Sequence, residues 1–330
     1  MPFAAVGMEP DKVQLWSLLF SLSMIASLCV AFLVAQLGST RGGLRGFHVL
    51  FPPRRPRVVP WGISTIAPVL VIFLLIPSIP HWIITQIFPE PLDFLQHGNV
   101  TIDNLADQHP LTILMQKSGH HSLVILVCFL TAVIVAPLTE ELVFRIVFQG
   151  GIQATLRREF GQTVMAKWFP VVVTAVFFAG IHFRLPTQPE IDQHYIDQLF
   201  KGMISILIGR LIAVAAVIVF FRSYYRIRPS DIGLRDFRHI GRDALGALLL
   251  TPAVFIPVVI VNAAVQKLAK TQWAATHDIS GSMIDPVPLF LFSLVIGTLY
   301  YRTQRFASVF FLHAFFNLFS FLILMYLTFR

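Results

Sequence analysis

The sequence has few charged side chains. Only 13% of its 330 residues are Asp, Glu, Lys or Arg, whereas a soluble domain carries about 25%. So few charges do not cover a water-exposed surface, which excludes a soluble globular protein. Hydrophobic residues make up 56% of the chain and 31 residues are Phe, so most of the sequence must face lipid or protein. The composition predicts an integral membrane protein that crosses its bilayer several times.

Cysteine is also scarce. Cys29 and Cys128 are the only two, and both lie in apolar stretches, so a disulfide framework and a Cys-based zinc site are excluded. The net charge is +8, but the basic residues form short clusters between apolar runs. That pattern is typical of the loops of membrane proteins, and we therefore expect no nucleic-acid partner.

Long apolar runs dominate what is present. A bilayer-spanning helix needs about 20 apolar residues, and eight segments approach that requirement: 13–36, 61–86, 122–150, 168–183, 203–221, 244–265, 287–300 and 306–328. The first follows an acidic rather than a basic leader, which favours a retained span over a cleaved signal. The predicted fold is all-α, a polytopic transmembrane helical bundle of about eight spans. Which membrane it occupies stays open.

The loops between these runs alternate in charge. Loops 41–57 and 222–242 are rich in Arg, whereas loops 89–120 and 184–201 are acidic. Because basic loops stay on the cytoplasmic side, we predict that the first two lie inside, the other two outside, and both termini outside.

Ionisable residues inside apolar runs are costly and usually functional. In APLTEELVFRIVFQG, Glu141 and Arg145 share one helical face and can pair, while Glu140 points about 100° away and stays free for chemistry. Pro137 is expected to break or start a helix there, and Thr139 to cap the new segment.

Two later runs carry similar pairs. Phe178 and His182 are four residues apart, and so are His313 and Asn317, so each pair shares a helical face. Together with the glutamates, these groups supply what is needed to activate water and to stabilise an oxyanion. Arg210 is a further intramembrane charge, for which we expect a structural ion pair.

These motifs resemble those of the CAAX protease and bacteriocin-processing family of intramembrane endopeptidases, which includes the Ras-converting type. The family pattern is E-E-x-x-x-R, then F-x-x-x-H, then H-x-x-x-N or D, each on its own transmembrane helix. The resemblance covers about 120–183 and 286–325. It implies peptide-bond hydrolysis by these residues: Glu140, Glu141, Arg145, Phe178, His182, His313 and Asn317.

The resemblance also implies roles. Glu140 is the general base, His182 helps to hold the water, and His313 and Asn317 donate hydrogen bonds to the oxyanion. Because one water must touch the base and the donors, we predict that the functional atoms of Glu140, His182 and His313 lie within about 8 Å of one another. Residues that meet must lie at the same depth in the membrane. We therefore expect the third span to continue past 150, the fourth to continue past 183, and Pro137 to divide the third.

The separation of the second and third motifs is longer than the family pattern suggests. We therefore predict N-terminal spans and loops in 1–120, a first part of the protease core in 121–183, an insertion with two further spans in 184–285, and the last part of the core in 286–330.

Three alternatives stay open. Glu140, His182 and His313 could instead hold Zn²⁺, because carboxylate and imidazole ligands with an open position make a hydrolytic site. An ion- or proton-coupled transporter would spread its charges along a path, and a non-catalytic membrane scaffold would keep no motif intact. The expected partners are the lipid bilayer and a membrane-associated peptide or protein substrate. Prenylated C-a-a-X tails define one branch of the family.

Overall fold

The computed structural model describes residues 59–89, 110–117, 121–182, 193–233, 239–272 and 286–328. Within these ranges every regular element is a helix, which confirms the all-α prediction. The helices are α3 (Ile66–Leu75), α4 (Ser78–Ile87), α5 (Pro110–Lys117), α6 (Ser122–Phe129), α7 (Ala136–Glu141), α8 (Gly150–Phe160), α9 (Val164–Ile181), α10 (Gln193–Tyr224), α11 (Ile240–Gln272), α12 (Pro286–Thr303) and α13 (Phe306–Thr328). Short 3₁₀ helices lie at Ile63–Thr65 and Pro229–Ile232.

Six helical stretches in the described residues are long and apolar enough to cross a membrane, so the chain is a multi-pass integral membrane protein. They are Ile63–Ile87, Ser122–Phe160, Val164–Ile181, His194–Tyr224, Ile240–Val265 and Phe306–Thr328. Each matches one predicted span. The predicted span 287–300 forms α12, which is not among the six and buries most of its residues inside the bundle. The predicted span 13–36 lies outside the described residues, as do most of the loops on which the predicted topology depends.

The helix Ser122–Phe160 is the longest candidate span, with 39 residues. It continues past residue 150, as predicted. Two stretches within it, η4 (Leu130–Val135) and η5 (Leu142–Gln149), are π-helical. Pro137 therefore does not divide the helix, because it lies in α7 directly after the π-helical stretch η4 and the helix continues through it. Thr139 does not act as a cap either, since its Oγ1 donates to the carbonyl of Val135 at 2.7 Å.

The π-helical turn has a chemical consequence at Ala132. In a π-helix the donor to a carbonyl is the amide five residues later, and for Ala132 that residue is Pro137, which has no N–H. The Ala136 amide does not serve instead, because it bonds to Thr131. The Ala132 carbonyl is thus left without a backbone donor, and a partly buried carbonyl in that state favours another partner.

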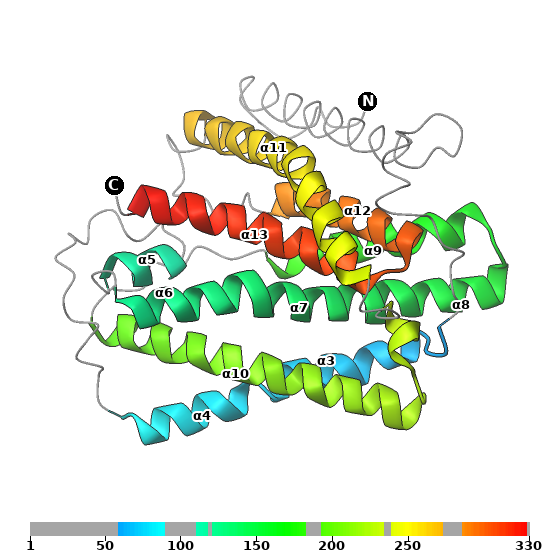
Figure 1. Ribbon diagram of the computed structural model, residues 1–330, viewed down its shortest axis with the longest axis horizontal. Coiled ribbons are helices and arrows are strands. Elements are labelled where there is room, and N and C mark those ends of the chain that lie inside the picture. The colour runs from blue at the N-terminus through cyan, green and yellow to red at the C-terminus, as the bar shows by residue number, and fades with distance from the viewer. Residues whose placement is uncertain are drawn as a thin grey trace, which may run out of the picture.

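The long helix crosses the middle of the bundle (Figure 1). On one side α10 packs against α7 and η4 as well as against α3 and α4, and on the other side α13 packs against α7, η4 and α11. Helix α12 lies along α9. The prediction that 184–285 is an insertion stays a prediction, but α10 and α11 within it pack directly against the elements that carry the motifs.

The fourth span ends earlier than predicted. Helix α9 stops at Ile181, and His182 forms its C-cap. Its imidazole therefore leaves the last turn of the helix rather than the middle of a span. This end of α9 is where the second motif meets the first.

Candidate active site

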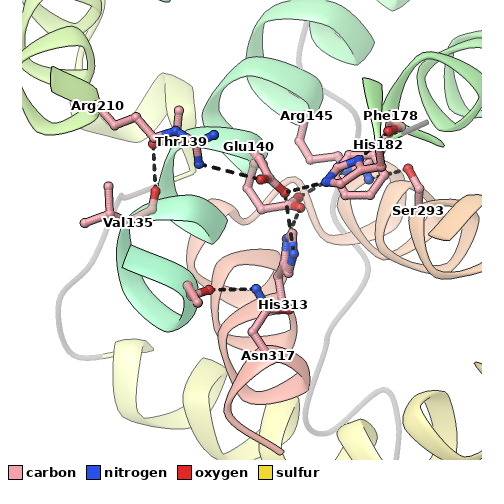
Figure 2. Close-up of polar contacts among 12 residues, drawn as sticks. Val135, Thr139, Glu140, Arg145, Phe178, His182, Arg210, Ser293, His313 and Asn317 are labelled. Atoms are coloured by element: carbon pink, nitrogen blue, oxygen red, sulfur yellow. Dashed lines mark hydrogen bonds and ion pairs between the residues drawn. The ribbon is translucent and has the colours of Figure 1, made fainter. Parts of the chain in front are cut away.

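Glu141 and Arg145 form the buried ion pair that their spacing predicts. Arg145 Nε donates to Glu141 Oε2 at 3.0 Å, and both side chains have no exposed surface. Arg145 Nη2 also donates to Ser293 Oγ at 2.7 Å, which ties the long helix to α12 (Figure 2). The charge of each partner is thus compensated inside the bundle, as a buried ion requires.

The second oxygen of Glu141 holds a residue from the third motif. Glu141 Oε1 lies 2.8 Å from His313 Nδ1. A carboxylate paired with arginine only accepts hydrogen bonds, so Nδ1 carries the proton and donates. In a neutral imidazole the other nitrogen, Nε2, is then an acceptor. Sequence spacing gave no sign of this contact, because it joins residues on two different helices.

Glu140 lies free of this network and close to both histidines. Its Oε2 is 3.9 Å from His182 Nε2 and 3.7 Å from His313 Nε2. The prediction that these three residues converge within about 8 Å is therefore confirmed. In Figure 2 dashed lines join the Glu140 carboxylate to both imidazoles.

His182 is oriented by its own helix. Its Nδ1 lies 2.7 Å from the carbonyl oxygen of Phe178, which again makes Nδ1 the donor and turns Nε2 towards Glu140 as an acceptor. The Phe178 ring is 4.7 Å from the His182 ring between centroids, and Arg145 Cζ is 5.8 Å from the Phe178 centroid. The predicted i, i+4 pair thus forms, and Phe178 packs between the ion pair and the imidazole.

Asn317 has a partner other than the one we predicted. Its Nδ2 donates to the carbonyl of Ala132 at 2.8 Å. This is the carbonyl that Pro137 leaves without a backbone donor. Asn317 therefore joins α13 to the π-helical segment, and the structure gives it no contact with Glu140.

Comparison with known families identifies the chain. The family model described as Type II CAAX prenyl endopeptidase Rce1-like matches residues 122–319. That match spans more than half of the sequence and contains all three motifs. The chain belongs to this family. No curated protein and no solved structure matches it.

Arg210 of this CAAX endopeptidase family member forms an ion pair, as the sequence predicted, but its partner belongs to the candidate site. The structural ion pair that we expected for it is with Glu140: Arg210 Nη1 lies 3.8 Å from Glu140 Oε1. The arginine sits on α10, which the motifs do not include. Figure 2 shows Arg210 and His182 on opposite sides of Glu140. The sequence did contain a sign of this role, because an arginine in an otherwise apolar run usually marks a functional position in a membrane protein.

Zinc binding by Glu140, His182 and His313 stays a prediction from their ligand types. Two ligands on one tetrahedral zinc, each about 2.1 Å from the metal, would be about 3.4 Å apart, and the separations of 3.7 and 3.9 Å exceed that. No group of three or more His, Cys, Asp or Glu side chains in the described ranges is arranged to hold a metal ion. The donor types suit zinc, but their spacing does not, so no step below is routed through a metal.

Proposed function

We propose that the chain is an intramembrane endopeptidase in which Glu140 activates water to hydrolyse a peptide bond of a membrane-associated substrate. The observation that carries the proposal is the Glu140 carboxylate, with two imidazole Nε2 atoms within 3.9 Å of one of its oxygens. Membership of the CAAX prenyl endopeptidase family supports the same chemistry.

The water is held by acceptors on two helices. It donates one hydrogen bond to Glu140 Oε2 and the other to His182 Nε2, whose lone pair is fixed by the bond from Nδ1 to Phe178. His313, fixed by Glu141, borders the same oxygen. A water so oriented presents its own lone pair to a carbonyl carbon, as general-base catalysis needs.

The reaction then proceeds in two steps. The water oxygen bonds to the carbonyl carbon, one water proton passes to Glu140, and the carbonyl π electrons move to its oxygen. In the second step the oxyanion collapses, the C–N bond breaks, and Glu140 returns its proton to the leaving nitrogen. The products are a new carboxyl terminus and a free amine, and Glu140 is again ionised.

The site has an accessible part and a buried part. The side chains of His182, Arg210 and Glu140 are 29%, 32% and 14% exposed, whereas those of Glu141 and His313 are 0% and 4% exposed. We infer that substrate and water reach Glu140 past the partly exposed side chains of His182 and Arg210.

A prenylated C-a-a-X peptide in proteoliposomes tests the proposal. We expect the purified chain to release the three-residue tail, detected by mass spectrometry. The Glu140→Gln variant, which keeps the shape of the side chain, should release none. Equal release by both proteins would contradict the proposal, and the same peptide without its prenyl group shows whether the lipid is required.

A further inference from the structure

We propose that Arg210 is a further catalytic residue, whose guanidinium donates hydrogen bonds to the oxyanion of the tetrahedral intermediate. The inference rests on the proposed function and adds a residue outside the three motifs. Hydrolysis moves negative charge from Glu140 to the former carbonyl oxygen. That oxygen needs donors at about 2.7–3.1 Å.

Each of the other polar side chains of the site already has a hydrogen-bond partner. The Nε2 atoms of His182 and His313 are acceptors in the neutral rings, because each Nδ1 donates to an oxygen. Asn317 Nδ2 donates one of its two N–H groups to the Ala132 carbonyl. Arg145 is bonded to Glu141 and Ser293, and although its Nη1 has no hydrogen-bond partner, the side chain has no exposed surface.

Arg210 is placed and exposed as a donor must be. Its Nη1 is 3.8 Å from Glu140 Oε1, which is an electrostatic contact too long for a hydrogen bond, and 32% of its side chain is exposed. The two imidazoles lie at the other carboxylate oxygen, Oε2. A carbonyl attacked by water at Oε2 can therefore direct its oxygen towards Arg210. The guanidinium offers five N–H groups and stays protonated throughout.

The position of Arg210 is built into the helix packing. The preceding residue, Gly209, faces the turn between α3 and α4, where an added Cβ would lie 2.5 Å from Pro77 Cα. Only glycine allows so close an approach of α10. This contact fixes the segment of α10 from which Arg210 reaches Glu140.

The charges remain balanced through the reaction. Before attack, Arg210 faces the Glu140 carboxylate. When Glu140 takes the water proton it becomes neutral, and the negative charge appears on the carbonyl oxygen. Arg210 then pairs with that oxygen, so its interaction is strongest in the transition state and lowers the barrier rather than only aiding binding.

Recognition of a substrate carboxylate is the rival role for this arginine. In a C-a-a-X substrate the carboxylate lies three residues beyond the scissile bond, about 10 Å along an extended chain. Arg210 lies only 3.8 Å from Glu140. That distance places it beside the scissile carbonyl rather than beside the end of the tail.

The experiment compares Arg210→Met, Arg210→Lys and a control, Arg222→Met, which removes an exposed arginine from the same helix. Cleavage of the prenylated peptide gives kcat and KM. A peptide analogue with a tetrahedral P–O⁻ group in place of the scissile carbonyl gives an inhibition constant.

We expect Arg210→Met to lower kcat by about 10²–10³-fold, with KM changed by less than about threefold, and to weaken binding of the analogue by a similar factor. Arg210→Lys, which keeps the charge but loses the planar fork, should lose about tenfold. Arg222→Met should cleave as the unaltered chain does.

Several results would overturn the inference. One is a kcat of Arg210→Met within about threefold of the unaltered value. Another is a loss confined to KM that disappears when the peptide ends in an amide, which assigns Arg210 to the substrate carboxylate. If Arg210→Met fails to fold, an Arg210→Lys protein with unchanged kcat and analogue affinity decides against the role. Absence of cleavage by the folded, unaltered chain instead contradicts the proposed function, and this inference falls with it.

Discussion

The two glutamates of the first motif are neighbours in sequence but lie in different environments. Glu141 has no exposed surface, and its oxygens contact Arg145 at 3.0 Å and His313 at 2.8 Å. Glu140 is 14% exposed, and its contacts with His182, Arg210 and His313 lie between 3.7 and 3.9 Å. The short bonds of Glu141 make it a fixed structural support. The longer distances around Glu140 leave room for water and substrate to enter.

The difference arises from helix geometry. Adjacent residues on a helix point about 100° apart, so one glutamate faces α12 and α13 while the other faces the space beside α10. The same short sequence thus supplies the buried support and the reactive group. Substitutions that affect only one of the two glutamates test this division.

The largest effect on stability is expected for Glu141→Gln. It leaves the Arg145 charge without a carboxylate in the interior, and removal of one member of a buried pair costs about 3–5 kcal/mol. We expect a lower free energy of unfolding in detergent together with lower cleavage. Glu159→Gln, on the exposed surface of the same long helix, is the matched control and should change neither. Unaltered stability of Glu141→Gln would show that the pair is not a structural support.

A smaller effect, on activity alone, is expected for His182→Ala. The imidazole is 29% exposed and lies at the end of α9, so its removal creates no cavity in the core. Loss of the group that orients the water should lower kcat by about 10²-fold while the melting temperature stays within about 2 °C. His194→Ala removes an exposed histidine at the start of α10 and serves as the control. A large fall in melting temperature would contradict this prediction and show that His182 is a structural support, as Glu141 is.

The smallest effect is expected for Asn317→Ala. It leaves the Ala132 carbonyl without a donor, which costs about 1–3 kcal/mol, and should lower stability more than kcat. Ser320→Ala, which removes a hydroxyl bonded within the same helix to Phe316, provides the comparison. A 10²-fold loss of kcat with unchanged stability would instead return Asn317 to the role of oxyanion donor.

Sequence reasoning predicted contacts within one helix and failed for some between helices. The pairs Glu141–Arg145 and Phe178–His182 follow from i, i+4 spacing, and both form. The contact of Asn317 with Ala132 could not be predicted, because it depends on the π-helical stretch that precedes Pro137, which a regular α-helical spacing does not contain.

The role of α10 was hidden for a related reason. Arg210 carries no partner in its own run, and its approach to Glu140 depends on the contact between Gly209 and Pro77. Gly209 and Pro77 are both common residue types in membrane helices, so the sequence did not single them out. The family match across residues 122–319 includes α10, whereas the motifs alone did not.

The Glu140→Gln variant tests the central claim most directly, with peptide cleavage and melting temperature measured on the same preparation. The substitution keeps the shape of the side chain and removes only its proton-accepting charge. The division between the two glutamates predicts a loss of cleavage of about 10³-fold or more, with a melting temperature equal to that of the unaltered chain. Cleavage at the unaltered rate would contradict the assignment of Glu140 as the base that activates water.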